Sequence, residues 1–159
     1  ISELTVLVLD RPRHEKLIQE IRAAGARVRL ITDGDVAGAI APCLPNSGID
    51  MLMGIGASAE GVLAAVAIKC LGGDMQCRLA PPNAEHMARV QAMGITNISK
   101  KLMLEDLAQG RDLTFTATGV LEGPLLKGVQ WRVGYITTHS VVMRVKTRTV
   151  RFLETMHRI

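Results

Sequence analysis

Aromatic side chains are scarce in this sequence, and that scarcity excludes some classes of partner. Only 3% of the residues are aromatic while 48% are hydrophobic, so the core must be built from aliphatic side chains. Nucleic-acid surfaces usually combine clustered Lys and Arg with stacking aromatics. Despite a net charge of +4, we therefore expect no nucleic-acid partner, and a small anionic ligand suits the charge better.

Metal-binding cysteine motifs and membrane-length apolar runs are also missing. Cys43, Cys70 and Cys77 show neither CxxC nor Cys/His spacing, which predicts free thiols in a reducing compartment and argues against zinc. Apolar runs are interrupted well before membrane-spanning length. There is no signal-peptide pattern, so we expect a cytoplasmic protein without a membrane partner. The chain starts with Ile1 rather than Met, which suggests a truncated or processed chain.

The first third of the chain alternates apolar runs with helix-like segments. The run Leu4–Leu9 shows no polar alternation, as is typical of a strand buried on both faces of a parallel sheet. Gly25 is well placed to end the helix that follows. These signals predict an α/β domain over residues 1–159. The expected elements are a helix at 13–24, a strand at 27–31, a short helix at 36–41 and a strand at 50–53.

A glycine-rich loop follows the third expected strand and leads into a helix at about 59–71. Its sequence, from Leu52 to Gly61, places Glu60 in the first helical turn. Glycines allow close approach to the backbone, and a helix start favours an anion. Two phosphate-loop patterns are excluded, because Val62 and Leu63 follow Gly61 and Ala59 replaces the third dinucleotide glycine. A turn that serves folding alone is an equally good interpretation of this loop.

The second half changes its periodicity. Residues 75–79 indicate a fourth strand, 84–93 a helix, and 95–110 a weak helix. From Asp112 onward the pattern has period two, with Phe115, Val141 and Met143 on one side and Arg144, Lys146 and Arg148 on the other. This predicts an antiparallel hairpin region, with the basic row as a solvated strand face or edge guard.

Each of the three expected strands in the first third ends in a polar loop. Parallel strands bring such loops to one edge of the sheet, where ligands bind. Arg11 and Arg13 suit a phosphate, Asp33 and Asp35 suit hydroxyls or a hard cation, and Glu60 adds a third carboxylate. Taken singly, these residues also fit surface charges, a capped turn and a helix-start charge. No histidine is assigned as a base.

Several motifs resemble those of class II fructose-bisphosphatases, in the group that also takes sedoheptulose bisphosphate. The likeness covers essentially all 159 residues in the same order. The matching segments are Asp10–His14, Thr32–Ala37, the loop ending at Glu60–Val62, Cys70–Gln76, Ala117–Val120, Leu125–Gly128 and Thr137–Ser140.

This resemblance implies a layered sheet-and-helix domain of the inositol monophosphatase-like sugar-phosphatase superfamily. It implies a Mn²⁺- or Mg²⁺-dependent phosphatase that removes the 1-phosphate of fructose 1,6-bisphosphate. Glu60 would be a metal ligand, and no residue is assigned as catalytic. The family usually has glycine where Ala57 stands and proline where Ala59 stands. The implied substrate-binding residues are Arg11, Pro12, Arg13, Asp33, Gly34, Asp35 and Ala57.

The resemblance covers only the carboxyl-terminal half of the family. The amino-terminal half, which holds most of the family's metal-binding acids, would then be a missing partner, and this chain alone would be inactive. We also expect a homo-oligomer. The alternative functions are a non-catalytic sugar-phosphate sensor and a nucleotide-binding regulatory module. The second is disfavoured because neither glycine fingerprint is present.

Overall fold

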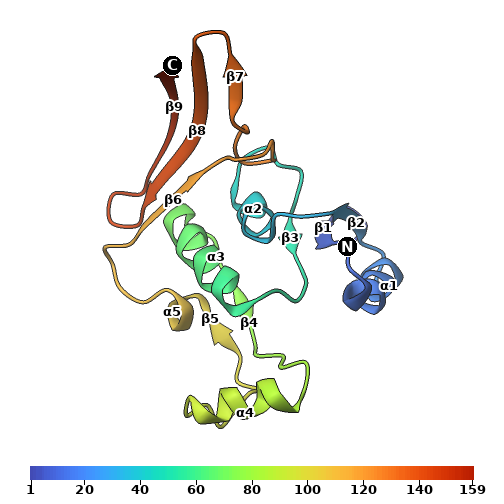
Figure 1. The fold of residues 1–159 in the computed structure, drawn as a ribbon. Coiled ribbons are helices and arrows are strands. Elements are labelled where there is room, and N and C mark those ends of the chain that lie inside the picture. Colours follow the sequence, from blue (N-terminus) through green and yellow to red (C-terminus); the bar gives the residue numbers. More distant parts are fainter.

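A computed structural model describes all residues 1–159 and shows an α/β architecture (Figure 1). The amino-terminal region is a three-stranded parallel sheet of order β2-β1-β3. Its central strand β1 (Thr5–Leu9) is buried almost throughout, as the unalternating run predicts. The flanking strands are β2 (Arg27–Ile31) and β3 (Met51–Leu52), and β3 is shorter than the expected 50–53.

Helices cover both faces of β1, which explains why its sequence has no polar face. Val6 and Val8 pack against Ile18 and Ile21 of α1 (Glu15–Ala23) on one side. On the other side, Leu7 lies beneath α2 (Asp35–Ile40). A Cβ at Gly38 of α2 would come within 2.8 Å of the Leu52 side chain and 3.2 Å of Leu7. Glycine therefore lets α2 sit directly on the sheet.

The long helix α3 (Ser58–Leu71) lies between α2 and the carboxyl-terminal antiparallel sheet. It packs against α2 through Ala64 and Ile68, which form one cluster with Ala39. Toward the carboxyl-terminal region it contributes Ala67 to the largest core cluster. The other buried members of that cluster are Ile40, Cys70, Phe115, Leu126, Val141 and Met143.

The carboxyl-terminal region is antiparallel, as the period-two pattern predicts. Strand β8 (Tyr135–Arg144) pairs along one edge with β6 (Thr114–Thr118) and β7 (Gln130–Arg132). Along its other edge it pairs over its whole length with β9 (Thr149–Arg158). Figure 1 shows β8 and β9 in orange and red, extending well beyond the helices.

The middle of the chain differs from the sequence-based expectation. Only Gln76–Cys77 of the expected strand at 75–79 is β-structure, as β4, and it pairs antiparallel with β5 (Leu102–Met103) rather than joining the parallel sheet. The expected helix at 95–110 is wrong except for the single turn α5 (Leu104–Leu107). Helix α4 (Ala84–Ala92) begins as expected, because the Asn83 side chain accepts a hydrogen bond from the His86 N–H.

Short 3₁₀ helices extend two of the expected helices. Pro12–His14 forms one before α1, and Ala41–Cys43 forms another after α2. Proline at the first or second position of such a turn lacks an N–H that would be unpaired in any case. Pro42 therefore continues the helical path for one turn, although the sequence led us to end the helix before it.

Candidate functional site

The three polar loops do converge at one edge of the parallel sheet, and a buried histidine ties two of them together. His14 is 1% exposed and ends the first loop. Its Nδ1 lies 2.8 Å from the Leu9 carbonyl oxygen and must donate to it, while its Nε2 accepts a hydrogen bond from the Ile55 N–H at 2.9 Å. These partners fix one tautomer and hold the glycine loop against the end of β1.

Arg13 adds a second link between the same two loops. Its Nε donates to the Ile55 carbonyl oxygen at 2.9 Å, so Ile55 is held through both its backbone N–H and its C=O. The terminal guanidinium nitrogens of Arg13 make no hydrogen bond within the chain and remain available for an anion. Arg11 is half-buried, donates to the Asp10 carbonyl oxygen at 3.3 Å, and flanks Pro12 at the start of the 3₁₀ turn.

The loop after β2 approaches the glycine loop from the other side. A Cβ at Gly56 would lie 3.0 Å from Oδ2 of Asp35, so the absence of a side chain there permits the close approach. Gly34 precedes α2 in the left-handed region, with φ of 93°. Asp33 accepts a hydrogen bond from the Gly34 N–H at 2.8 Å. Asp33 therefore stabilises its own turn, and Asp35 is the carboxylate nearer to the loop convergence.

Helix α3 begins at this convergence with no side-chain cap. Ala57 is the N-cap residue, with φ −77° and ψ 156°. These are ordinary extended angles for any residue, so alanine in place of the family's glycine causes no backbone strain. With no side chain capping them, the first N–H groups of α3 form an electropositive helix start beside Arg13 and Asp35.

Glu60 has an unpaired atom next to this helix start. Its Oε2 is buried and has no hydrogen-bond partner. A buried, unpaired carboxylate oxygen is costly unless a donor or a cation satisfies it. However, the chain brings together no group of three His, Cys, Asp or Glu side chains that could hold a metal ion. Glu60 therefore fits a metal as one ligand, and the described residues do not complete a coordination shell.

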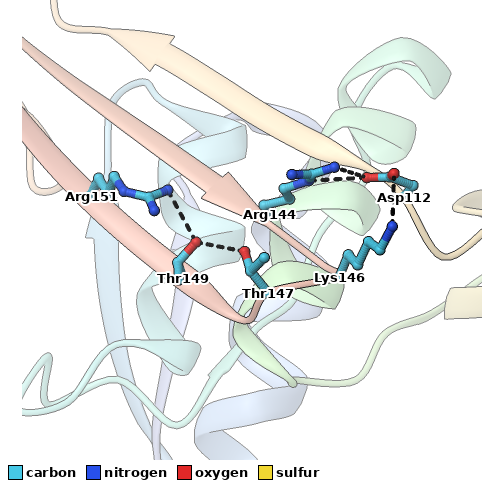
Figure 2. Close-up of polar contacts among 6 residues, drawn as sticks. All are labelled: Asp112, Arg144, Lys146, Thr147, Thr149 and Arg151. Atoms are coloured by element: carbon cyan, nitrogen blue, oxygen red, sulfur yellow. Dashed lines mark hydrogen bonds and ion pairs between the residues drawn. The ribbon is translucent and has the colours of Figure 1, made fainter.

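The basic row of the hairpin lies away from the loops. Asp112 binds Arg144 through its Oδ1, at 2.7 Å from Nη2, and Lys146 through its Oδ2, at 3.8 Å from Nζ (Figure 2). Lys146 and Arg148 line a cavity of about 710 Å³ at the carboxyl end of α3. Since α3 has 14 residues, this cavity lies about 20 Å from the helix start, so it is separate from the candidate site.

The role of His14 was missed by the sequence interpretation, since a single histidine has no spacing pattern. The prediction of free thiols is confirmed: all three cysteines are unpaired. Burial raises the pKa of Cys43 and of Cys70, and it is also the main cause of the raised pKa of Cys77. Such thiols are poor nucleophiles near neutral pH. No helix has both the length and the apolar character needed to cross a bilayer.

Comparison with known proteins identifies the family. The family described as "Bacterial fructose-1,6-bisphosphatase, glpX-encoded" matches residues 1–157. The chain is 43% identical, over 99% of its length and 51% of the relative's, to a fructose-1,6-bisphosphatase class 2 of Haemophilus influenzae. It is also similar to a D-fructose 1,6-bisphosphatase class 2/sedoheptulose 1,7-bisphosphatase of Microcystis aeruginosa, with 45% identity over 99% of this chain and 49% of that protein.

A protein of the same double name from a Synechococcus strain is 43% identical over the same shares. The chain thus spans about half the length of the curated relatives it matches. The near-complete family match confirms the resemblance that the loop motifs suggested. The chain belongs to the family of bacterial, glpX-encoded fructose-1,6-bisphosphatases.

Proposed function

We propose that this chain provides the sugar-phosphate-binding half of a phosphatase that hydrolyses the 1-phosphate of fructose 1,6-bisphosphate and acts also on sedoheptulose 1,7-bisphosphate. The observation that supports it is the meeting of three loops at one sheet edge, where Arg13 and His14 hold Ile55 and Asp35 reaches Gly56. The family match gives this geometry its chemical interpretation.

In this proposal each loop binds a different part of the substrate. Arg11 and Arg13 bind a phosphate, since a guanidinium offers forked donors that match phosphate oxygens. Asp35 accepts hydrogen bonds from sugar hydroxyls, with Asp33 and Gly34 shaping the turn. The uncapped start of α3 at Ala57 adds backbone N–H donors and a positive helix dipole for the same anion. Pro12 fixes the backbone between the two arginines.

We propose Mn²⁺ or Mg²⁺ as the cofactor and Glu60 as one of its ligands. The unpaired Oε2 of Glu60 supports this assignment. Bound metal would neutralise phosphate charge and supply an activated water. Because no second and third ligand accompany Glu60 within the chain, we propose that the remaining ligands belong to the half of the enzyme that this chain does not match.

A non-catalytic sugar-phosphate sensor is the second candidate function. It is favoured by one observation, the lack of a complete metal-ligand group in residues 1–159. A sensor would bind fructose 1,6-bisphosphate with equal affinity in the presence and absence of metal, and it would stay inactive with any partner. The phosphatase half, by contrast, should gain turnover when it is mixed with the complementary half.

Titration calorimetry of the chain with fructose 1,6-bisphosphate, with and without Mn²⁺, tests the binding half of the proposal. We expect Arg13→Ala to weaken binding by about tenfold or more, because a charged hydrogen bond contributes about 1.5–3 kcal/mol. Arg22→Ala, on the exposed side of α1, is the matched control and should leave binding unchanged. Equal affinity for both variants would contradict the assignment of Arg13.

The catalytic part of the proposal is tested by mixing this chain with the complementary half of the Haemophilus influenzae enzyme and measuring phosphate release. Glu60→Gln should lower turnover and metal affinity while sparing substrate binding. Turnover by this chain alone would contradict the division into halves. We further propose an inositol monophosphatase-like superfamily fold, a homo-oligomeric enzyme and a cytoplasmic location, the last supported by the free thiols.

A further inference from the structure

The β8–β9 ribbon exposes large apolar side chains on the same face as the core. Residues directly opposite in an antiparallel pair share a face, so Val150 and Phe152 lie beside the buried Met143 and Val141. Yet Phe152 is 52% exposed, and Met156, further along this face of β9, is 58% exposed. Phe152 and Met156 thus continue this face along β9 beyond the core, with Glu154 between them and the Phe152 ring stacked on His139.

The outer edge of β9 has no neighbouring strand. β9 is ten residues long and pairs only with β8. The Ile159 N–H donates to the Gly134 carbonyl oxygen, and hydrogen bonds alternate along an antiparallel ladder. The N–H groups of Phe152, Glu154 and Met156 therefore point away from β8. Long edges with apolar neighbours are normally paired or covered, because they otherwise template aggregation.

We infer that this edge, with the exposed Phe152 and Met156 beside it, is the docking surface for the half of the class 2 enzyme that this chain does not match. That half would add a strand along β9 and cover Phe152 and Met156. Two observations favour this occupant over others. The chain spans 51% and 49% of its relatives, so those relatives contain about an equal length of polypeptide that this chain does not match. The Phe152 face also adjoins the largest core cluster, which consists of residues from α2, α3, the antiparallel sheet and the segment between β6 and β7.

Continuity with a core distinguishes this surface from a transient binding patch. A partner strand on β9 would extend an existing core, as in the interior of one folded unit, and main-chain pairing would supply affinity without special side chains. The inference rests on the proposed function in one respect: it takes the docking partner to be the other half of the same enzyme. Its test measures complex formation and not catalysis, so the two can fail separately.

The experiment mixes this chain with the unmatched half of the Haemophilus influenzae enzyme and measures binding by calorimetry and size-exclusion chromatography with light scattering. The double variant Phe152→Glu/Met156→Glu should weaken the complex by about tenfold or more, since buried aromatic anchors dominate interfaces. Met93→Glu is the control, because Met93 is 75% exposed as the C-cap residue of α4, and α4 lies at the far end of the molecule from β9 (Figure 1). Unchanged binding of the double variant, or equal weakening by the control, would overturn the inference.

Strand addition is tested separately at Glu154. Glu154→Pro removes one outward N–H while leaving Phe152 and Met156 in place, and edge positions tolerate proline. Glu154→Ala keeps that N–H and controls for loss of the Lys127–Glu154 ion pair at 3.6 Å. We expect only the proline variant to weaken the complex, with both variants retaining the thermal stability of the parent chain. Equal binding by the two variants would exclude strand addition.

A second copy of this chain is the competing occupant. Light scattering of the chain alone, over a concentration series, should give the same molecular mass for the parent chain and for Phe152→Glu/Met156→Glu, because we expect no self-association through β9. A dimer that Phe152→Glu/Met156→Glu dissociates would assign the surface to a second copy and overturn the inference. A complex that depends on β9 but releases no phosphate would uphold the docking surface and contradict the proposed function instead.

Discussion

Strand β1 of the parallel sheet and strand β9 of the antiparallel sheet reach opposite degrees of burial. In β1, the residues from Val6 to Leu9 are buried because α1 covers one face and α2 the other. In β9, Phe152, Leu153 and Met156 remain 52%, 43% and 58% exposed. The difference lies in what surrounds each strand. Helices of the chain cover both faces of β1, whereas most of β9 is left exposed.

The largest expected effect is on the free energy of unfolding, when the same leucine-to-alanine substitution is made in β1 and in β9. Leu7→Ala in β1 removes a side chain that is 4% exposed, whereas Leu153→Ala in β9 removes one that is 43% exposed. Truncation of a buried leucine costs about 2–5 kcal/mol, and most exposed substitutions stay within about 0.5 kcal/mol. Urea unfolding of the isolated chain should show this contrast. Leu153 lies on the opposite face of β9 from Phe152, so a large loss for Leu153→Ala would mean that this second face is already covered in solution.

A smaller effect is expected at the histidine that joins the loops. His14→Phe leaves the Leu9 carbonyl and the Ile55 N–H without their partner. Loss of such a buried partner costs about 1–3 kcal/mol, so the variant should be less stable, and the Ile55 amide should exchange its hydrogen faster. His157→Phe, on exposed β9, is the control and should change neither quantity. Normal protection of Ile55 in His14→Phe would show that Arg13 alone holds the loop.

The contrast between the two regions also explains which parts the sequence predicted. Leu4–Leu9 was assigned correctly because burial on both faces leaves an unalternating pattern, and the hairpin was assigned because one buried face leaves period two. The predictions for residues 75–79 and 95–110 were wrong because β4 and β5 are two-residue strands that depend on pairing with each other. A pairing between short, distant segments leaves no local period.

The meeting of the loops at the candidate site could also be predicted from the sequence, whereas the roles of their residues stay predictions. Parallel strands dictate that their following loops meet, so the approach of Asp35 to Gly56 and the link from Arg13 to Ile55 follow from topology. The part played by His14 could not be predicted, because it depends on the distance between two backbone groups that are far apart in sequence. Likewise, the unpaired oxygen of Glu60 is a property of the folded surroundings and not of the helix start.

Gly56 in the glycine-rich loop and Gly61 in helix α3 give a comparison with smaller effects, of about 1 kcal/mol in the free energy of unfolding. Gly61 lies inside α3, and a Cβ added there would meet nothing within 4 Å. Gly61→Ala should therefore stabilise the chain by about 0.5–1 kcal/mol, through helix propensity. Gly56→Ala places its methyl 3.0 Å from Asp35 Oδ2 and should bring no gain. Melting temperatures of the two variants measure the difference, and a matching gain for Gly56→Ala would show that Asp35 moves freely.

The smallest expected effect is a change of stability with pH that depends on Asp106, a carboxylate outside both regions. The Met103 N–H and Lys100 both donate to Asp106, and these bonds lower its pKa, the backbone bond being the larger cause. A lowered pKa in the folded state stabilises the fold above the unfolded value of about 3.9. That contribution is lost as pH falls through the folded pKa.

Asp106→Asn imitates the protonated carboxyl, since it keeps an acceptor for the Met103 N–H and removes the charge. The variant should therefore be slightly less stable than the parent chain near neutral pH, and the difference should begin to close at about pH 4 and vanish once the pH is below the folded pKa of Asp106. Lys100→Met should reproduce only part of this loss of stability, because the hydrogen bond from the Met103 N–H to Asp106 remains. Urea unfolding at a series of pH values measures this, and a gap that persists in acid would mean that Asp106 acts through its geometry and not its charge.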